Sequence, residues 1–424
     1  MNKFNRFASA AAAFALAAAS ASCNAPEAIT FGKGAQTALT VDGYEVPAGV
    51  FIYNEISAYR TAMYDMYYKN GSMPTLDDVK NATIEELDAT DWIQNNATDA
   101  CKDFVANEKE FEKIGESLTD DQLAEVKDIL SSYSGETMFT ENGVGEESIR
   151  KIIENNYKKE AVFKHYYGLD AEKGCTEDEL KTYYQDKTTR IKYFAVSMTD
   201  ENGDEYGADE KRRLNNMIDD YVKEINAEKT NDAKLKKIDE CEEDYKKYTE
   251  ERKAEAEAKA AEEAGETTTT TTTATTTTGT GTTTTTTADP HANEVTVTKY
   301  TTTKADDNDS SDTTTTEASA EESAAEKAYK DYNDHIFAMS YNKAEKYQYD
   351  ENTVYVVIRA DIKERMTADD LWTQDKIDSL LIERYYTDFE DMMKSVVKGY
   401  SVEKNNTAYR KYTPFKLNLE ASES

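Results

Sequence analysis

The cysteines and histidines are the residues of this chain whose side chains could act as nucleophiles or metal ligands. They are Cys23, Cys101, Cys175, Cys241, His165, His291 and His335. No two cysteines have the C-x-x-C spacing of a redox or zinc motif, and the histidines are too scattered to form a zinc site. The three cysteines after Cys23 are an odd number, so they predict isolated thiols and no closed disulfide framework. We therefore expect no metal and no cofactor.

Cys23 differs from the other cysteines because it ends a targeting segment. Residues 1–23 begin with basic residues, and 7–19 is an alanine-rich apolar run that is too short to span a bilayer as a stable helix. The small residues directly before Cys23 resemble a bacterial lipobox, which implies a diacylglyceryl anchor on this cysteine and an extracytoplasmic protein at the outer face of the membrane. Ser20 stands where a lipobox usually has leucine. The alternative is an ordinary secretory signal in which Cys23 is incidental.

Composition excludes several classes of partner and singles out the middle of the chain. Lys and Arg number 50 and Asp and Glu number 84, so the net charge is 50 − 84 = −34, which argues against nucleic acid and against electrostatic docking on anionic lipid. Residues 250–263 contain only Glu, Lys, Arg and Ala, and 267–287 are almost all threonine. Neither stretch predicts a core. The threonine tract at 267–287 has two interpretations: an insert without specific function, or a glycan acceptor.

Two strands frame this middle region. Apolar and polar residues roughly alternate over 190–197, which predicts a half-buried strand, and a capping box of Thr176 and Glu179 predicts the helix before it. Residues 353–360 are rich in β-branched residues and predict a buried strand. We expect these two strands to pair across an insert of more than 100 residues, because the entropy of closing a loop grows only slowly with its length.

The strand that begins Arg190-Ile191-Lys192-Tyr193, with its preceding helix and following acidic turn, resembles the opening of a parvulin-type prolyl isomerase domain. Such domains occur in extracytoplasmic foldases of the SurA and PrsA kind, where this strand usually reads Arg-Val-Lys-His-Ile-Leu and the last strand Gly-Tyr-His-Ile-Ile-Lys. The two family histidines fall at Tyr193 and Val356. Neither residue has comparable proton chemistry. The resemblance thus implies a degenerate domain with no catalytic residues.

The flanking regions resemble the chaperone part of SurA-like foldases. A short strand pair with an Asp42-Gly43 turn leads into a helix from Pro47 to about Lys69, and a long helix at 367–398 follows the second strand. In the family, such a helix folds back on the N-terminal module and forms a cradle for unfolded clients. The tyrosine- and methionine-rich faces of these helices supply the candidate client-binding residues, although ordinary helix packing explains the same pattern. These candidates are Phe51, Tyr59, Met63, Met66, Tyr67, Tyr385, Phe389 and Met392.

The expected fold class is α+β and mainly helical. The expected divisions are a lipoprotein signal (1–23), a flexible leader (24–37), a SurA-like helical module (38–175), a split parvulin-like domain (176–230 and 322–362), a charged and threonine-rich insert (231–321), a C-terminal helix and tail (363–416) and a disordered end (417–424).

The sequence favours a membrane-anchored chaperone that binds unfolded secreted polypeptides and has little or no isomerase activity. Its partners would be such polypeptides and, through the lipid alone, the membrane. An active prolyl isomerase is the first alternative, because the reaction needs no covalent intermediate. A surface adhesin or spacer, with the threonine tract as a stalk, is the second.

Overall fold

The computed structural model describes residues 36–133, 137–200, 202–263, 289–300 and 324–419. The predictions for the signal segment with Cys23, for most of the leader and for the threonine tract lie outside these described residues. Within them the protein is mainly helical with small antiparallel sheets, so the expected α+β class is confirmed. None of the helices in the described ranges has the length and hydrophobicity that a bilayer-spanning segment needs.

The chain divides into two compact units. Unit 1 comprises the chain up to Leu180 and from Thr373 onward, and unit 2 comprises Lys181–Trp372. Unit 2 is thus inserted into the sequence of unit 1. The chain leaves unit 1 within helix α8 (Glu177–Lys187), whose expected capping box is present: the Thr176 N–H donates to a Glu179 carboxylate oxygen and the Glu179 N–H donates to the Thr176 hydroxyl.

Unit 1 is built mainly of helices. They are α2 (Ala48–Asn70), α3 (Leu76–Lys80), α4 (Ala89–Ile114), α5 (Asp120–Tyr133), α6 (Thr137–Glu141), α7 (Glu146–Tyr167), α12 (Gln374–Val397) and α13 (Asn406–Lys411). Its short strands are β1 (Thr37–Val41), β2 (Tyr44–Pro47), β3 (Thr83–Ile84), β4 (Leu87–Asp88) and β9 (Val402–Lys404). The expected hairpin is confirmed, because β1 and β2 pair through a turn in which Asp42 and Gly43 both have positive φ.

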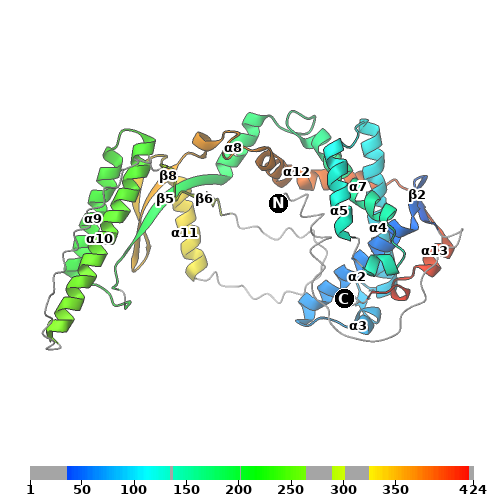
Figure 1. The fold of residues 1–424 in the computed structure, drawn as a ribbon, viewed down its shortest axis with the longest axis horizontal. Helices are drawn as coiled ribbons and strands as arrows, with labels where there is room; N and C mark the ends of the chain where they lie inside the picture. Colours follow the sequence, from blue (N-terminus) through cyan, green and yellow to red (C-terminus); the bar gives the residue numbers. More distant parts are fainter. Residues whose placement is uncertain (1–35, 134–136, 201, 264–288, 301–323, 420–424) are drawn as a thin grey trace, which may run out of the picture. The chain divides into compact units, whose positions relative to one another are not determined.

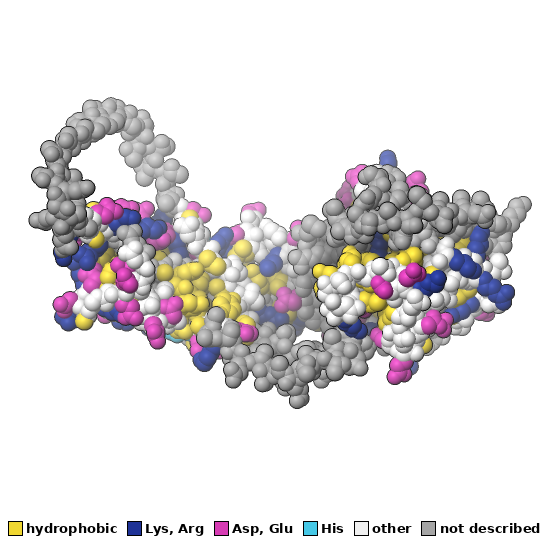
Figure 2. All heavy atoms as spheres, turned by 90° about the horizontal axis from the view of Figure 1, so that it is seen from below, with side chains coloured by type: hydrophobic (Ala, Val, Ile, Leu, Met, Phe, Trp, Pro, Cys, Tyr) yellow, Lys and Arg dark blue, Asp and Glu magenta, His cyan; other side chains and the backbone are white. Residues whose placement is uncertain are grey.

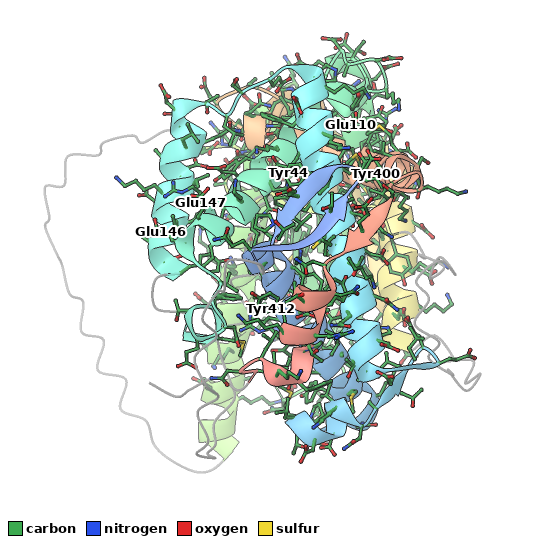
Figure 3. All side chains as sticks on the ribbon, turned by 90° about the vertical axis from the view of Figure 1, so that its right-hand side faces the viewer. Tyr44, Glu110, Glu146, Glu147, Tyr400 and Tyr412 are labelled. Carbon is green, nitrogen blue, oxygen red and sulfur yellow. The ribbon has the colours of Figure 1, made fainter. Side chains whose placement is uncertain are left out.

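The C-terminal tail completes the core of unit 1 (Figure 3). Strand β9 adds to β1, and Tyr412, labelled on the tail in Figure 3, is fully buried among residues of α2 and α4. Leu417 and Leu419 are buried in the same core. The expectation that the chain is disordered from residue 417 is therefore wrong for 417–419, because these apolar side chains fill space that the helices leave.

Helix α12 begins later than expected. Its N-cap is Thr373, whose hydroxyl accepts from the Lys376 N–H, whereas the sequence suggested a start at Thr367. A 3-10 helix, η1 (Ile362–Arg365), ends just before the Thr367 region. The helix packs on α7, where the rings of Phe163 and Phe389 meet edge to face at 5.4 Å.

Unit 2 is a four-stranded antiparallel sheet with helices on both faces. Its strands are β5 (Thr188–Ser197), β6 (Val295–Thr298), β7 (Ala344–Asp350) and β8 (Thr353–Ala360), in the order β6-β5-β8-β7. β5 pairs with β8 along its length, from Arg190 opposite Ala360 to Ser197 opposite Thr353, so the expected pairing of two distant strands is confirmed. Figure 1 shows α9 (Ala208–Ala227) and α10 (Asn231–Glu263) as a helical pair, with α11 (Ala324–Ala338) apart from them.

The expected insert at 231–321 is in part a structural component of unit 2. Leu235, Ile238 and Cys241 of α10 are buried against the sheet, and β6 is an edge strand of it. The interpretation of 231–321 as a separate, coreless insert is therefore wrong for these two segments. The apolar residues of these two segments are few. Strand alternation in β6 places its apolar residues on one face of the strand, and helical spacing in α10 places its apolar residues on one face of the helix.

Candidate binding face and edge of the four-stranded sheet

The two positions that correspond to the parvulin histidines do not meet in the structure. Phe194 lies opposite Val356 and Tyr193 lies opposite Val357, and successive side chains of a strand point to opposite faces. Val356 is fully buried in the core under α9 and α10, whereas Tyr193 lies on the other face and is 40% exposed. The structure therefore places no paired hydrogen-bonding groups at these positions.

The second face of the sheet carries a cluster of aromatic rings, which we call the tyrosine face. It comprises Tyr193 of β5, Tyr332 of α11, Tyr347 and Tyr349 of β7 and Tyr355 of β8. The Tyr355 ring centroid lies 5.1 Å from that of Tyr193, 5.0 Å from that of Tyr349 and 5.3 Å from that of Tyr332. Such tilted and edge-to-face pairs are favourable beyond the area they bury. Figure 2 shows hydrophobic side chains gathered on the surface of the unit that contains this sheet.

Three phenols of the tyrosine face, those of Tyr332, Tyr347 and Tyr355, have pKa values raised by burial and stay protonated near pH 7. Burial raises the pKa of Tyr332, and the nearby phenols of Tyr193 and Tyr355 raise it further. Burial also raises the pKa of Tyr347 and of Tyr355. The hydroxyl of Tyr332 is buried and has no hydrogen-bond partner among the described residues. The face thus offers stacking surfaces and uncharged hydrogen-bonding groups, which suit the binding of peptide better than acid–base chemistry.

Beneath the opposite face, β5 contributes a buried arginine. Arg190 is 1% exposed, and its guanidinium donates to Glu294 at 2.8 Å, to Glu364 at 2.9 Å and to the Asp361 carbonyl oxygen at 2.7 Å. Arg365 donates to Glu294 from the other side at 3.0 Å. Because each charge has a partner of opposite sign, this cluster holds the segment before β6 on the sheet rather than supplying a reactive group.

Lys192, two residues along β5, is buried in the same way. Its ammonium donates to Asp239 of α10 at 2.6 Å and to the Pro290 carbonyl oxygen at 3.1 Å. The strand at 190–197, expected to be half-buried, is buried at both of these cations, because segment 289–294 covers them. The sequence feature that indicates a partner for these cations is Glu294, an acidic residue directly before the Val-Thr-Val-Thr alternation of 295–298.

Comparisons with protein-family models, with curated proteins and with solved structures find no match for this chain. The likeness to parvulin-type domains thus stays an interpretation of the residues quoted above.

The client-binding candidates of unit 1 differ in how far they reach the surface. Phe51, Tyr59 and Phe389 are core residues, so they cannot line a surface in this structure. Met63, Met66, Tyr385 and Met392 are half-buried, and the two methionines of α2 pack against the core. Tyr67 is exposed, and its ring meets that of the still more exposed Tyr68 at the end of α2. Sequence reasoning missed Tyr68.

The three cysteines in the described part of the chain lie inside the protein. Cys101, Cys175 and Cys241 are buried and free, and no group of His, Cys, Asp and Glu side chains suited to a metal ion occurs within the described ranges. Burial raises the pKa of both Cys101 and Cys241 to about 12. These two thiols therefore remain protonated and unreactive near neutral pH.

Proposed function

We propose that this protein is a lipid-anchored extracytoplasmic chaperone that binds unfolded secreted polypeptides and has little or no prolyl isomerase activity. The tyrosine face is the observation that supports this most directly. It places an exposed ring, Tyr193, next to a half-buried one, Tyr355, on a rigid sheet. Tyrosine supplies large amphipathic contact area at a low entropic cost, which suits the recognition of many different sequences.

The absence of isomerase activity is proposed from the two family positions. Val356 has no hydrogen-bonding side chain and is enclosed by the core, and Tyr193 lies on the other face of the sheet. An isomerase site needs a proline pocket and hydrogen bonds that favour the twisted amide. The two positions lie on different faces of the sheet, and this separation supports the proposal of little or no isomerase activity.

The test is a pair of assays on the same protein preparation. Suppression of aggregation of reduced insulin B chain measures client binding, and a protease-coupled assay on a Xaa-Pro peptide measures isomerisation. We expect suppression that falls in the double variant Tyr193→Ser, Tyr355→Ser and persists in Tyr68→Ser, a matched change at a tyrosine of unit 1 that is 80% exposed. Isomerisation at enzyme-like rates without suppression would overturn the proposal and favour an active isomerase.

Anchoring is tested separately at Cys23. The small residues before it and the end of the apolar run at this point support lipid attachment. We expect Cys23→Ala to move the protein from the membrane fraction to the aqueous fraction, since one modified cysteine carries the whole anchor. A variant that remains entirely with membranes would contradict this assignment.

A further inference from the structure

Strand β5 is paired along only part of one edge. On one side it pairs with β8 from Arg190 to Ser197, but on the other side β6 covers only Thr188 to Ile191. β6 begins at Val295 because the chain turns away just before it: Asn293 has a φ of 64°, and Glu294 is held by Arg190. Beyond Ile191 this edge of β5 has no strand beside it among the described residues.

Two hydrogen bonds show which backbone groups face the uncovered edge. The Met198 N–H donates to the Asn352 carbonyl oxygen on the β8 side, and the Ser197 N–H donates to the Tyr245 hydroxyl. In an antiparallel pair, alternate residues direct both N–H and C=O to the same neighbour. Tyr193 and Ala195, which alternate with Phe194 in this pattern, therefore direct their N–H and C=O groups to the uncovered edge, and both residues are exposed.

The opposite edge of the sheet is protected. On β7, the Ala344 N–H donates to the Asn226 side chain at 2.9 Å, and the Ala344 carbonyl oxygen accepts from it at 2.8 Å. Lys346 follows on the same strand and pairs with Asp219. Capping groups and lysines are what natural sheets use to prevent further strand addition. The β5 edge has neither device over 193–195, so the two edges of one sheet differ.

The surroundings of the β5 edge define the chemistry of a strand that would fit it. In an added strand, the residues that pair with Tyr193 and Ala195 would direct their side chains to the tyrosine face. Apolar or aromatic side chains suit the exposed rings there. The residue between them would face α10, which runs beside β5 through the contacts of Asp239 with Lys192 and of Tyr245 with Ser197. From Asp239 to Asp244 every residue of α10 except Cys241 is acidic. Lysines pair with three of these five acids, so the stretch keeps an excess of negative charge, which favours lysine or arginine there.

We propose that the edge of β5 at Tyr193–Ala195 binds an extended polypeptide segment as an additional antiparallel strand, in line with β6. The segment alternates apolar residues toward the tyrosine face with basic residues toward α10. Main-chain hydrogen bonds give such binding its affinity and the alternate side chains give it selectivity. This inference rests on the proposed client binding and names its site and its class of ligand.

Backbone-methylated peptides provide the sharpest test. The probe is an end-capped nine-residue peptide of alternating valine and lysine, titrated onto the full chain. In the proposed register the valine N–H groups point to β5 and the lysine N–H groups point away. N-methylation of the valines is expected to weaken binding by about tenfold or more, a loss of the order of one or two hydrogen bonds. The matched control, N-methylation of the lysines, is expected to leave the affinity within about twofold.

A second measurement locates the peptide on the protein. Amide hydrogen exchange at Tyr193 and Ala195 is expected to slow on addition of the unmethylated peptide, while exchange at Lys346 and Gln348 of the β7 edge stays unchanged. Ala195→Pro removes an outward N–H and is expected to abolish the slowing at Tyr193 and to weaken binding. Gln348→Pro on β7 is the matched proline control, and circular dichroism of both variants verifies that the sheet is retained.

The outcomes separate this inference from the function it rests on. Equal affinity for both methylated peptides, or protection at β7 in place of β5, would overturn strand addition at this edge. If in addition the chain still suppresses insulin aggregation, clients bind elsewhere and the chaperone proposal stands. If the peptide protects Tyr193 and Ala195 but the chain suppresses no aggregation, strand addition stands and the chaperone proposal fails.

Discussion

Two tyrosine-rich regions of this protein differ in how far their rings are exposed to solvent. On α2 of unit 1, Tyr59 is 4% exposed and packs edge to face against Phe415 of the C-terminal tail, whereas Tyr193 on the sheet of unit 2 is 40% exposed. The helix face is covered because the tail returns to it and closes the core. One face of the sheet carries only α11 among the described residues and keeps part of its aromatic surface in contact with solvent. Tyrosine content alone therefore does not identify a binding surface.

The two tryptophans of the chain allow the units to be followed separately. Trp92 lies in the core of unit 1 and Trp372 is buried in unit 2, where its ring lies near that of Tyr184. A variant that retains only one tryptophan reports the unfolding of one unit. Each prediction about stability can thus be assigned to the unit that carries the change.

The largest effect is expected at the core phenylalanines of unit 1. Phe51 and Phe389 are fully buried, and their replacement by alanine is expected to lower the free energy of unfolding by about 3–5 kcal/mol, since each leaves a cavity. Denaturant unfolding followed by Trp92 fluorescence should shift, while the Trp372 transition stays in place. If a variant kept its stability but lost aggregation suppression, the helix face of unit 1 would not be a closed core. In that case α2 or α12 would open to bind clients.

The buried ion cluster of unit 2 should give the next largest effect. Glu294→Ala leaves Arg190 and Arg365 without their shared carboxylate, although Arg190 keeps Glu364 and a carbonyl oxygen. We expect a loss of about 3 kcal/mol, at the lower end of the range for breaking a buried pair. The Trp372 transition reports it. An unchanged transition would mean that segment 289–298 contributes no stability and that the uncovered edge of β5 is longer than the structure shows.

A smaller effect, dependent on pH, is expected at Glu55 in unit 1. Its carboxyl group is enclosed by the core and one oxygen has no described partner, and burial raises its pKa well above the ordinary value. A raised folded-state pKa means that the stabilisation is fully present below the unfolded-state pKa, about 4.3, and is lost as pH rises through the folded-state value. Unit 1 should therefore lose stability as pH rises from 4.

Glu55→Gln is the variant that tests this dependence. The amide keeps the shape of the protonated carboxyl and does not ionise, so this part of the pH dependence of the Trp92 transition should disappear. The variant should gain stability relative to the natural chain as pH rises. Parallel pH profiles for the two proteins would show that Glu55 is ionised or solvated in the folded state.

Local sequence signals predicted most elements of this fold and little of its binding surface. The Asp42-Gly43 turn, the capping box at Thr176 and the helix that follows Pro47 all depend on short-range signals, and the structure has each of them where the sequence predicts it. Burial depends on which distant segment covers a residue. Nothing local to Arg190 shows that Glu294, 104 positions along the chain, will enclose it.

The candidate site was missed for the same reason. The sequence singles out Tyr193 for the family histidine at its position, but other rings of the tyrosine face, Tyr332, Tyr347 and Tyr355, come from three other elements. The open edge beside it depends on where β6 begins, which the turn at Asn293 determines. Only the paired strands bring these features together.

The smallest effect on stability is expected at Tyr193, and it makes the comparison between the two regions most direct. Tyr193→Ala removes a ring that is already partly solvated, so the free energy of unfolding of unit 2 should fall by less than about 1 kcal/mol. The same change at the buried Tyr59 should cost unit 1 about 3 kcal/mol or more, because it leaves a cavity in the core.

Binding of the valine–lysine peptide should show the reverse order: it should weaken in Tyr193→Ala and remain unchanged in Tyr59→Ala under conditions where unit 1 is still folded. The Trp92 and Trp372 transitions and one peptide titration for each variant measure all four quantities. If Tyr193→Ala destabilised unit 2 as strongly as Tyr59→Ala destabilises unit 1, the ring would be part of a closed core, and the tyrosine face would not be a binding surface.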